Sequence, residues 1–289
     1  MATAVETLRA LKRRIRTVEK TKQITKAMEM VAAAKLRKAQ ALVESARPYA
    51  YKMQEILESL AGAAALTHPF FQRREIKKVM ILAFTSDGGL CGSYNTNIIR
   101  RLNEELGSYA PDSVCLYLIG KKGYEHYRRR HWTIREKVLD LAGSADLMRV
   151  RSISKEVTGL FLTGEVDEVR LLYTRFLSTI TYRVTLENLL PIEDPRRGEE
   201  TSRRLEYLFE PSPASIFDDL LPRYCVTRIR TALAESFASE HGARMMAMGA
   251  ATQNAEEMME RLTRLRNRAR QASITKEMLE IVTGAEALK

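Results

Sequence analysis

No stretch of this 289-residue chain holds eighteen or more consecutive apolar residues, and its first residues lack the apolar core of a signal peptide. The sequence therefore predicts a protein that neither spans a membrane nor is secreted. Its three cysteines, Cys91, Cys115 and Cys225, are far apart and form no C-x-x-C pair. This spacing argues against a disulfide framework, fits a reducing cytoplasm, and predicts that the thiols are buried as small hydrophobic groups.

Sequence signals for an active site are also missing. The four histidines are scattered, and neither an H-E-x-x-H nor a G-x-S-x-G pattern occurs, so we expect no catalytic residue, metal or cofactor. The glycine-rich stretch at 86–92, S-D-G-G-L-C-G, follows an expected strand and precedes an expected helix, where α/β proteins bind phosphate. It lacks the lysine of a P-loop and the spacing of a dinucleotide turn. We expect a tight turn that needs glycine dihedrals, with a nucleotide site as the alternative.

Glycine and proline are nearly missing from both ends of the chain. Neither occurs before Pro48, and after Pro222 only three glycines interrupt the sequence. The segments 3–60 and 213–288 are therefore predicted as two long helices. Some seventy helical residues would span roughly 100 Å, more than the width of a compact domain of this size, so the C-terminal helix is expected to protrude.

Apolar residues in both helices recur in steps of three and four, the pattern of a coiled-coil seam. In the C-terminal helix the predicted seam is Met258, Leu262, Leu265, Ala269, Ala272 and Leu279. In the N-terminal helix it is Leu8, Leu11, Ile15, Val18, Thr21, Ile24, Met28 and Val31. Two consecutive steps of three in the second set predict a locally overwound stretch. Because a domain lies between the helices, we expect them to pair in antiparallel orientation.

The middle of the chain predicts a small α/β domain. Expected strands lie at 77–85, 113–119, 167–177 and 181–190, and expected helices at 95–106, 121–130 and 142–162. Strands that alternate with helices favour a largely parallel sheet, here with an antiparallel edge. The predicted organisation is an N-terminal coiled-coil helix at 1–60, an α/β domain at 70–205, and a C-terminal coiled-coil helix at 212–289.

Positive charge is concentrated on the two helices. The formal net charge is +11, and residues 1–40 hold eleven basic side chains against three acidic ones. Five arginines between residues 261 and 270 form a second cluster. Such helices predict an acidic partner, which could be a phosphate backbone, anionic lipid or acidic protein loops; a merely solvated helix face is the alternative. Aromatic residues are not interleaved with the basic ones, which weakens the case for a nucleic-acid binder.

Three stretches carry a resemblance to a known family. They are K-Q-I-T-K-A-M-E-M-V-A at 22–32, G-L-C-G at 89–92, and A-R-Q-A-S-I-T-K-E at 269–277, which is followed by I-V-T-G-A at 281–285. Through them the whole chain resembles the gamma subunit of the bacterial F-type ATP synthase. The resemblance implies an antiparallel coiled coil inside a ring of three alpha and three beta subunits. It also implies a Rossmann-like α/β domain at the foot, beside the epsilon subunit and the membrane c-ring.

The resemblance implies a noncatalytic rotor shaft that couples ion flow through the c-ring to conformational cycling of the catalytic beta subunits in ATP synthesis. Such a subunit is a peripheral membrane protein at the cytoplasmic face of the bacterial cell membrane and binds no nucleic acid. The implied contacts with beta subunits are Met28, Arg270 and Gln271. The implied foot contacts with the c-ring are Tyr207, Phe209 and Glu210. A basic coiled-coil nucleic-acid binder and a small α/β nucleotide-binding enzyme are the alternative functions.

Overall fold

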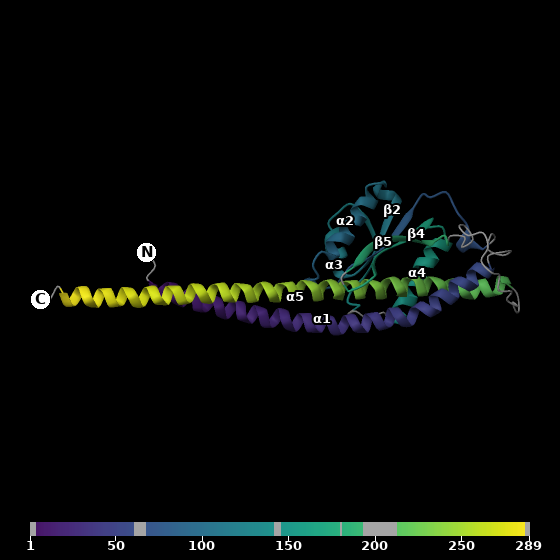
Figure 1. Ribbon diagram of the computed structural model, residues 1–289. Coiled ribbons are helices and arrows are strands. Elements are labelled where there is room, and N and C mark those ends of the chain that lie inside the picture. Colours follow the sequence, from purple (N-terminus) through teal and green to yellow (C-terminus); the bar gives the residue numbers. More distant parts are fainter. Residues whose placement is uncertain (1–3, 61–67, 142–145, 180, 193–212, 287–289) are drawn as a thin grey trace. The chain divides into compact units, whose positions relative to one another are not determined.

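The structure is a computed structural model that describes residues 4–60, 68–141, 146–179, 181–192 and 213–286. Its contacts divide the chain into two units. Unit 1 comprises Met1–Ala32 and Met245–Lys289, and unit 2 comprises Ala33–Arg244. The predicted long terminal helices are confirmed as α1, Ala4–Leu60, and α5, Pro213–Glu286 (Figure 1). The domain boundaries expected from the sequence stay a prediction.

In unit 1 the two helices form the expected antiparallel pair. Lys22 makes an ion pair with Glu256, and the hydroxyls of Thr25 and Thr252 lie 2.8 Å apart. Gly249 lies next to the carboxylate of Glu29. Residue numbers on α5 thus fall as those on α1 rise, which fixes the orientation and register of the pair.

The predicted seam of α5 is wrong in part, because the structure uses a neighbouring register. Met258, Leu265 and Leu279 are 49%, 43% and 61% exposed. The buried or half-buried residues that follow steps of four and three are Met248, Thr252, Ala255, Met259, Leu262, Arg266, Ala269 and Ser273. The two registers share Leu262 and Ala269, so apolar spacing alone could not separate them. The observed seam alternates the small residues Thr252, Ala255, Ala269 and Ser273 with larger side chains such as Met259 and Leu262.

The seam of α1 is also corrected, and its predicted overwinding disappears. Leu8, Leu11, Ile15 and Val18 are half-buried, as expected. After them the three/four alternation continues through Lys22, Thr25, Glu29 and Ala32, whereas the predicted Ile24 and Val31 are 60% and 55% exposed. A seam predicted from apolar residues alone cannot include the polar residues Lys22, Thr25 and Glu29. The coiled coil therefore has a polar stretch where α1 faces residues 249–256 of α5.

Beyond Ser273, α5 has no buried residue within the described part of the chain. Every position from 274 to 286 is exposed, among them the large apolar residues Ile274, Met278, Leu279, Ile281 and Val282. By the observed register the α1 residue opposite Ser273 lies close to Ala4, where α1 begins. Within unit 1, α5 therefore continues past the start of its partner helix.

Unit 2 contains a five-stranded sheet in the order β3-β2-β1-β4-β5. The strands are β1 Val79–Phe84, β2 Val114–Ile119, β3 Thr133–Val138, β4 Glu168–Phe176 and β5 Tyr182–Leu190. Four of them are parallel, and β5 pairs antiparallel with β4, so the expected antiparallel edge is confirmed. The prediction missed β3, because its sequence T-I-R-E-K-V holds three exposed charged residues; the strand lies at the sheet edge, where charge is tolerated.

Helices cover both faces of the sheet. α2, Tyr94–Leu106, and α3, Lys121–Tyr127, contribute Ile98, Leu102 and Tyr127 to a core with the β1 residues Val79 and Ile81. Successive residues of a strand point to opposite faces, and all six residues of β1 are buried, so the sheet is covered on its other face as well. α4, Leu147–Leu162, lies on that other face, where Glu156 accepts a hydrogen bond from the Tyr117 hydroxyl at 3.0 Å.

The corrected register of α5 can be tested with two matched substitutions. Leu262 is 6% exposed and Leu265 is 43% exposed. We expect Leu262→Ala to lower the free energy of unfolding by about 2–4 kcal/mol, and Leu265→Ala by under about 1 kcal/mol. Thermal and urea unfolding of the full chain, followed by circular dichroism, measures both. A larger loss for Leu265→Ala would restore the register predicted from the sequence.

Candidate functional site

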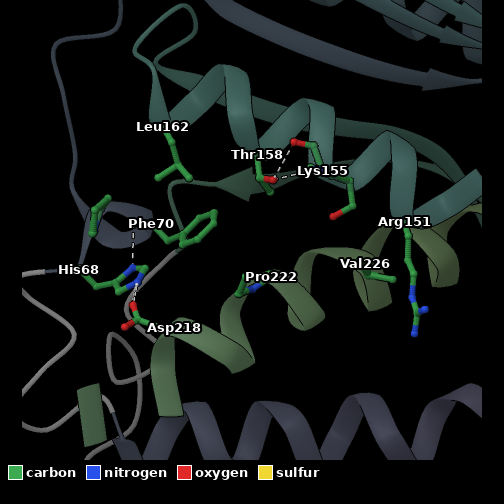
Figure 2. A pocket seen from close by; sticks show the side chains of 11 residues that line it. His68, Phe70, Arg151, Lys155, Thr158, Leu162, Asp218, Pro222 and Val226 are labelled. Carbon is green, nitrogen blue, oxygen red and sulfur yellow. Dashed lines mark hydrogen bonds and ion pairs between the residues drawn. The ribbon is translucent and has the colours of Figure 1, made fainter. Parts of the chain in front are cut away.

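Unit 2 has an open groove of about 530 Å³ (Figure 2). It lies between α4, the start of α5 and the short 3₁₀ helix Pro69–Phe71. Phe70, Leu162 and Val226 contribute apolar surface, and the exposed Arg151 and Lys155 stand on the α4 side. No cysteine lines the groove, and its one histidine, His68, lies 3.2 Å from Asp218. These groups form an open, partly apolar groove with two exposed cations at one side.

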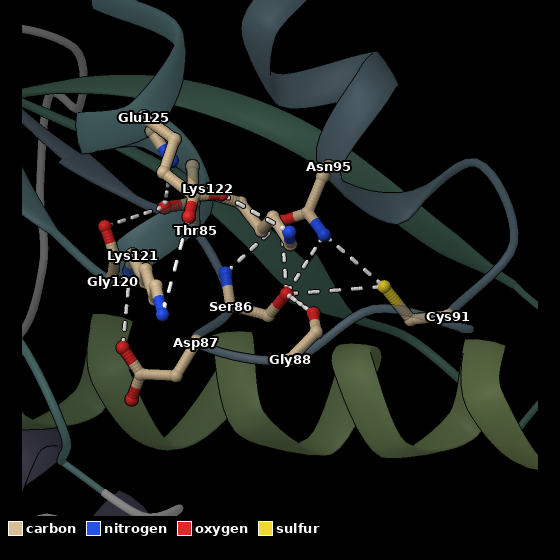
Figure 3. A network of polar contacts seen from close by, with 11 residues as sticks. Thr85, Ser86, Asp87, Gly88, Cys91, Asn95, Gly120, Lys121, Lys122 and Glu125 are labelled. Atoms are coloured by element: carbon tan, nitrogen blue, oxygen red, sulfur yellow. Dashed lines mark hydrogen bonds and ion pairs between the residues drawn. The ribbon is translucent and has the colours of Figure 1, made fainter. Parts of the chain in front are cut away.

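The glycine-rich turn between β1 and α2 is held by its own polar groups (Figure 3). The Ser86 hydroxyl donates to the carbonyl of Gly88 at 2.5 Å, and the Asn95 amide donates to the Ser86 hydroxyl at 2.7 Å. Asp87 accepts a hydrogen bond of 3.0 Å from the backbone N–H of Lys121. The side chains that might have met a phosphate therefore stabilise the turn instead.

Positive φ angles occur at fewer glycines of this turn than expected. Gly92 has φ 56°, but Leu90 adopts φ 60°, and neither Gly88 nor Gly89 has a positive φ. The glycine that geometry requires most strictly is Gly120, after β2, at φ 96°. A Cβ atom there would lie 2.0 Å from the carbonyl oxygen of Thr85. Gly120 was not among the residues predicted from the sequence, although a glycine between a buried strand and a helix is a usable signal.

The crevice in which a nucleotide would bind is filled by α5. In an open α/β sheet, ligands bind at the carboxyl ends of the strands, where strand order reverses, here between β1 and β4. At that end the Ser239 hydroxyl donates to the carbonyl of Thr174, near the end of β4, at 3.1 Å. Residues 232–243 of α5 are buried on every side, including the polar Glu240 and His241. The chain's own helix therefore occupies the crevice.

Arg244 joins α5 to the glycine-rich turn. Its Nε and Nη2 atoms donate to the carbonyl of Gly89 at 3.2 and 3.1 Å, and Nη1 lies 2.7 Å from Glu240. The same Nη1 is 3.0 Å from His241 Nδ1. Burial raises the pKa of Glu240, although Arg244 opposes the shift. Burial, with Arg244 and Lys35 nearby, lowers the pKa of His241 to about 4. His241 is thus a neutral histidine at neutral pH, held inside unit 2 by its contact with Arg244.

The three cysteines are buried and unpaired. Cys91, Cys115 and Cys225 are free and buried, which confirms the prediction, and burial raises the pKa of each thiol. Among the residues that the structure describes, no group of three or more metal-ligating side chains comes together. Over the same residues, no helix is long and apolar enough to cross a membrane.

The structure separates the residues expected to contact beta subunits. Met28 is half-buried on α1, and Arg270 and Gln271 are exposed on α5, beside the half-buried Ala269. Gly249 faces Glu29, the neighbour of Met28, so Arg270 is about 21 residues, or roughly 30 Å, farther along the pair. The three residues thus form two distinct patches of unit 1. The expected foot contacts, Tyr207, Phe209 and Glu210, lie outside the described residues.

Known proteins match the chain along nearly its whole length. The family model described as ATP synthase matches residues 7–288. The ATP synthase gamma chain of Moorella thermoacetica is 47% identical over 98% of this chain and 99% of the relative. That of Desulfitobacterium hafniense is 49% identical over 97% and 99%. The chain belongs to the ATP synthase gamma chain family.

Solved structures of mitochondrial ATP synthases share the fold. The central stalk and c-ring structure of the Tetrahymena thermophila mitochondrial ATP synthase matches with 25% identity and a TM-score of 0.62, over 79% of this chain and 99% of that chain. A Euglena gracilis mitochondrial ATP synthase structure matches with 20% identity and a TM-score of 0.70, over 98% and 94%. These matches support the gamma-chain hypothesis. The two alternative hypotheses, a nucleic-acid binder and a nucleotide-binding enzyme, gain no support from them.

Buried His241 should make unit 2 sensitive to mild acid. Its folded pKa of about 4 lies below the ordinary value of 6.5, so the unfolded chain takes up the proton first. Stability is therefore full above about pH 6.5 and is lost as the pH falls towards 4. We expect a loss on the order of 2 kcal/mol in urea unfolding between pH 7 and pH 4.5.

Two variants separate His241 from the neighbouring carboxylates. His241→Gln should remove most of that acid loss, while Glu240, whose pKa is shifted the other way, remains present in both chains. His131→Gln, at an exposed position, should keep the wild-type dependence on pH. An equal acid loss in His241→Gln and the wild type would contradict the assignment.

Proposed function

We propose that this chain is the central rotor shaft of an F-type ATP synthase. It couples ion flow through the c-ring to the conformational cycling of the catalytic beta subunits, and performs no catalysis itself. The observation that carries the proposal is the antiparallel pair of α1 and α5 in unit 1, in a chain that matches gamma chains over 98% of its length. The filled crevice of unit 2 supports the noncatalytic role.

The surface of unit 1 provides the asymmetry that a shaft needs. A rotor favours one beta-subunit conformation over another only through contacts that differ between its orientations. On α1 the exposed basic residues include Arg9, Lys12, Arg13, Arg14, Arg16 and Lys20. On α5 the exposed arginines are Arg261, Arg264, Arg268 and Arg270, with Arg264 beside Glu260 at 3.4 Å. Acidic loops of beta subunits are the partners that such positive faces recognise.

The proposed partners follow from this role. Three alpha and three beta subunits surround the helix pair, and the epsilon subunit and the c-ring meet the foot. Met28, Arg270 and Gln271 contact beta subunits in two patches, and Tyr207, Phe209 and Glu210 contact the c-ring. The chain is peripheral to the membrane at its cytoplasmic face and binds no nucleic acid.

Substitution of Met28 separates coupling from catalysis. Met28→Lys places a cation where the shaft passes beta-subunit loops, and a charge-assisted hydrogen bond formed at one orientation contributes about 1.5–3 kcal/mol. In reconstituted vesicles, ATP hydrolysis should persist, while ions pumped per ATP should fall. Met30→Lys is the matched control, because Met30 is 59% exposed on another face of α1, and it should couple more efficiently than Met28→Lys.

Both activities must be measured on the same vesicles. Hydrolysis and pumping that fall in equal proportion, or remain unchanged in Met28→Lys, would show that Met28 only packs between the helices. Failure of the wild-type chain to assemble with alpha and beta subunits would overturn the proposed function as a whole.

A further inference from the structure

One face of α4 remains unpartnered within the described chain, next to the groove of unit 2 (Figure 2). Residues spaced by steps of three and four form it: Met148, Arg151, Lys155, Gly159 and Leu162. Met148 is 69% exposed and Leu162 is 45% exposed. Apolar side chains at both ends thus flank two basic side chains at the centre, a pattern typical of a surface that packs against another helix.

The two cations of this face have no carboxylate partner among the described residues. Arg151 and Lys155 are both exposed and lie one helical turn apart, and no ion pair or side-chain hydrogen bond to a carboxylate is found for either. The acidic residue that lines the groove, Asp218, is paired with His68. A partner that binds this face should therefore carry two carboxylates one helical turn apart, the spacing of Arg151 and Lys155.

Gly159 gives independent support for a close approach at this face. A glycine inside a helix destabilises it relative to alanine, unless packing needs the missing side chain. Nothing in the described part of the chain provides that reason, because outside its own helical turn and chain neighbours no described heavy atom lies within 4 Å of the position that a Cβ would take. The glycine follows Lys155 by four residues, and Leu162 follows it by three, so it leaves room between the basic pair and the apolar end of the face.

We propose that the α4 face and its groove dock an acidic amphipathic helix of another subunit of the synthase. Apolar side chains of that helix enter the groove against Phe70, Leu162 and Val226, and two carboxylates one turn apart meet Arg151 and Lys155. The backbone of the docked helix passes over Gly159. This assignment rests on the proposed function, since it requires that the chain assembles with other subunits, and it concerns a surface distinct from the helix pair of unit 1.

Zero-length cross-linking tests the chemistry directly. A carbodiimide joins a lysine amine to a carboxylate only where the two are in contact. In the purified, assembled synthase, we expect Lys155 to be linked to an aspartate or glutamate of another subunit, within a peptide of amphipathic helical pattern. Peptide mass spectrometry identifies both linked residues. Absence of any intersubunit link from Lys155, in a complex whose other lysines are linked, overturns the proposal.

Charge reversal provides the matched variants. Arg151→Glu with Lys155→Glu should weaken retention of the linked subunit roughly tenfold or more, measured by native mass spectrometry across a salt series. Arg129→Glu with Arg183→Glu makes the same change of charge at exposed positions elsewhere in unit 2 and should retain the subunit. Gly159→Leu should also weaken retention, without a change of charge, while the melting temperature of the chain stays at or above that of the wild type.

The outcomes separate the groove from the proposed function. Retention of every subunit in both double variants and in Gly159→Leu, with coupling intact, overturns the docking site and leaves the rotor function standing. Loss of the linked subunit from the groove variants alone supports the docking site. A chain that enters no complex with alpha and beta subunits, even as wild type, overturns both.

Discussion

A helix that is buried on every side is stable only where most of its polar side chains find partners. In the buried stretch 232–243 of α5, Ser239, Glu240 and His241 find partners within unit 2, whereas the Ser236 hydroxyl has none among the described residues. Ser239 donates to a carbonyl of β4, and Glu240 and His241 both meet Arg244, which in turn holds the turn after β1. The sheet, the glycine-rich turn and α5 are therefore joined by one set of hydrogen bonds. This explains how a fold that commonly holds nucleotides can lack room for one.

Much of the fold could be predicted from the sequence, because its elements depend on local patterns. The missing prolines and glycines predicted α1 and α5, and the buried β1 and β2 were recognisable as short apolar runs. The register of the coiled coil could not be predicted, since Leu262 and Ala269 belong to both possible seams. The choice depends on which faces of the two helices approach closely, and that property belongs to the pair rather than to either sequence.

The candidate site shows a similar division. The resemblance supplied Met28, Arg270 and Gln271, but their separation into two patches required the observed register. The sequence pattern predicted that the glycines of the turn at 86–92, such as Gly88 and Gly89, are needed for its backbone. The position that can only be glycine is Gly120, because the backbone carbonyl of Thr85, at the end of another strand, leaves no space for a side chain. Close approach between segments far apart in the chain has no signature in either segment alone.

The polar seam of the coiled coil has a further consequence. Because Thr25, Glu29 and Thr252 lie between the helices, large apolar residues such as Ile24 and Leu265 face outwards. Apolar surfaces attract their neighbours without directional bonds. When the helix pair rotates against such a neighbour, no hydrogen bond is broken and no charged group loses its hydration. In the proposed rotor, which turns inside a ring of other subunits, these apolar parts of the surface add little to the energy barrier for rotation. Resistance to turning would then arise mainly at the charged patches, where angle matters.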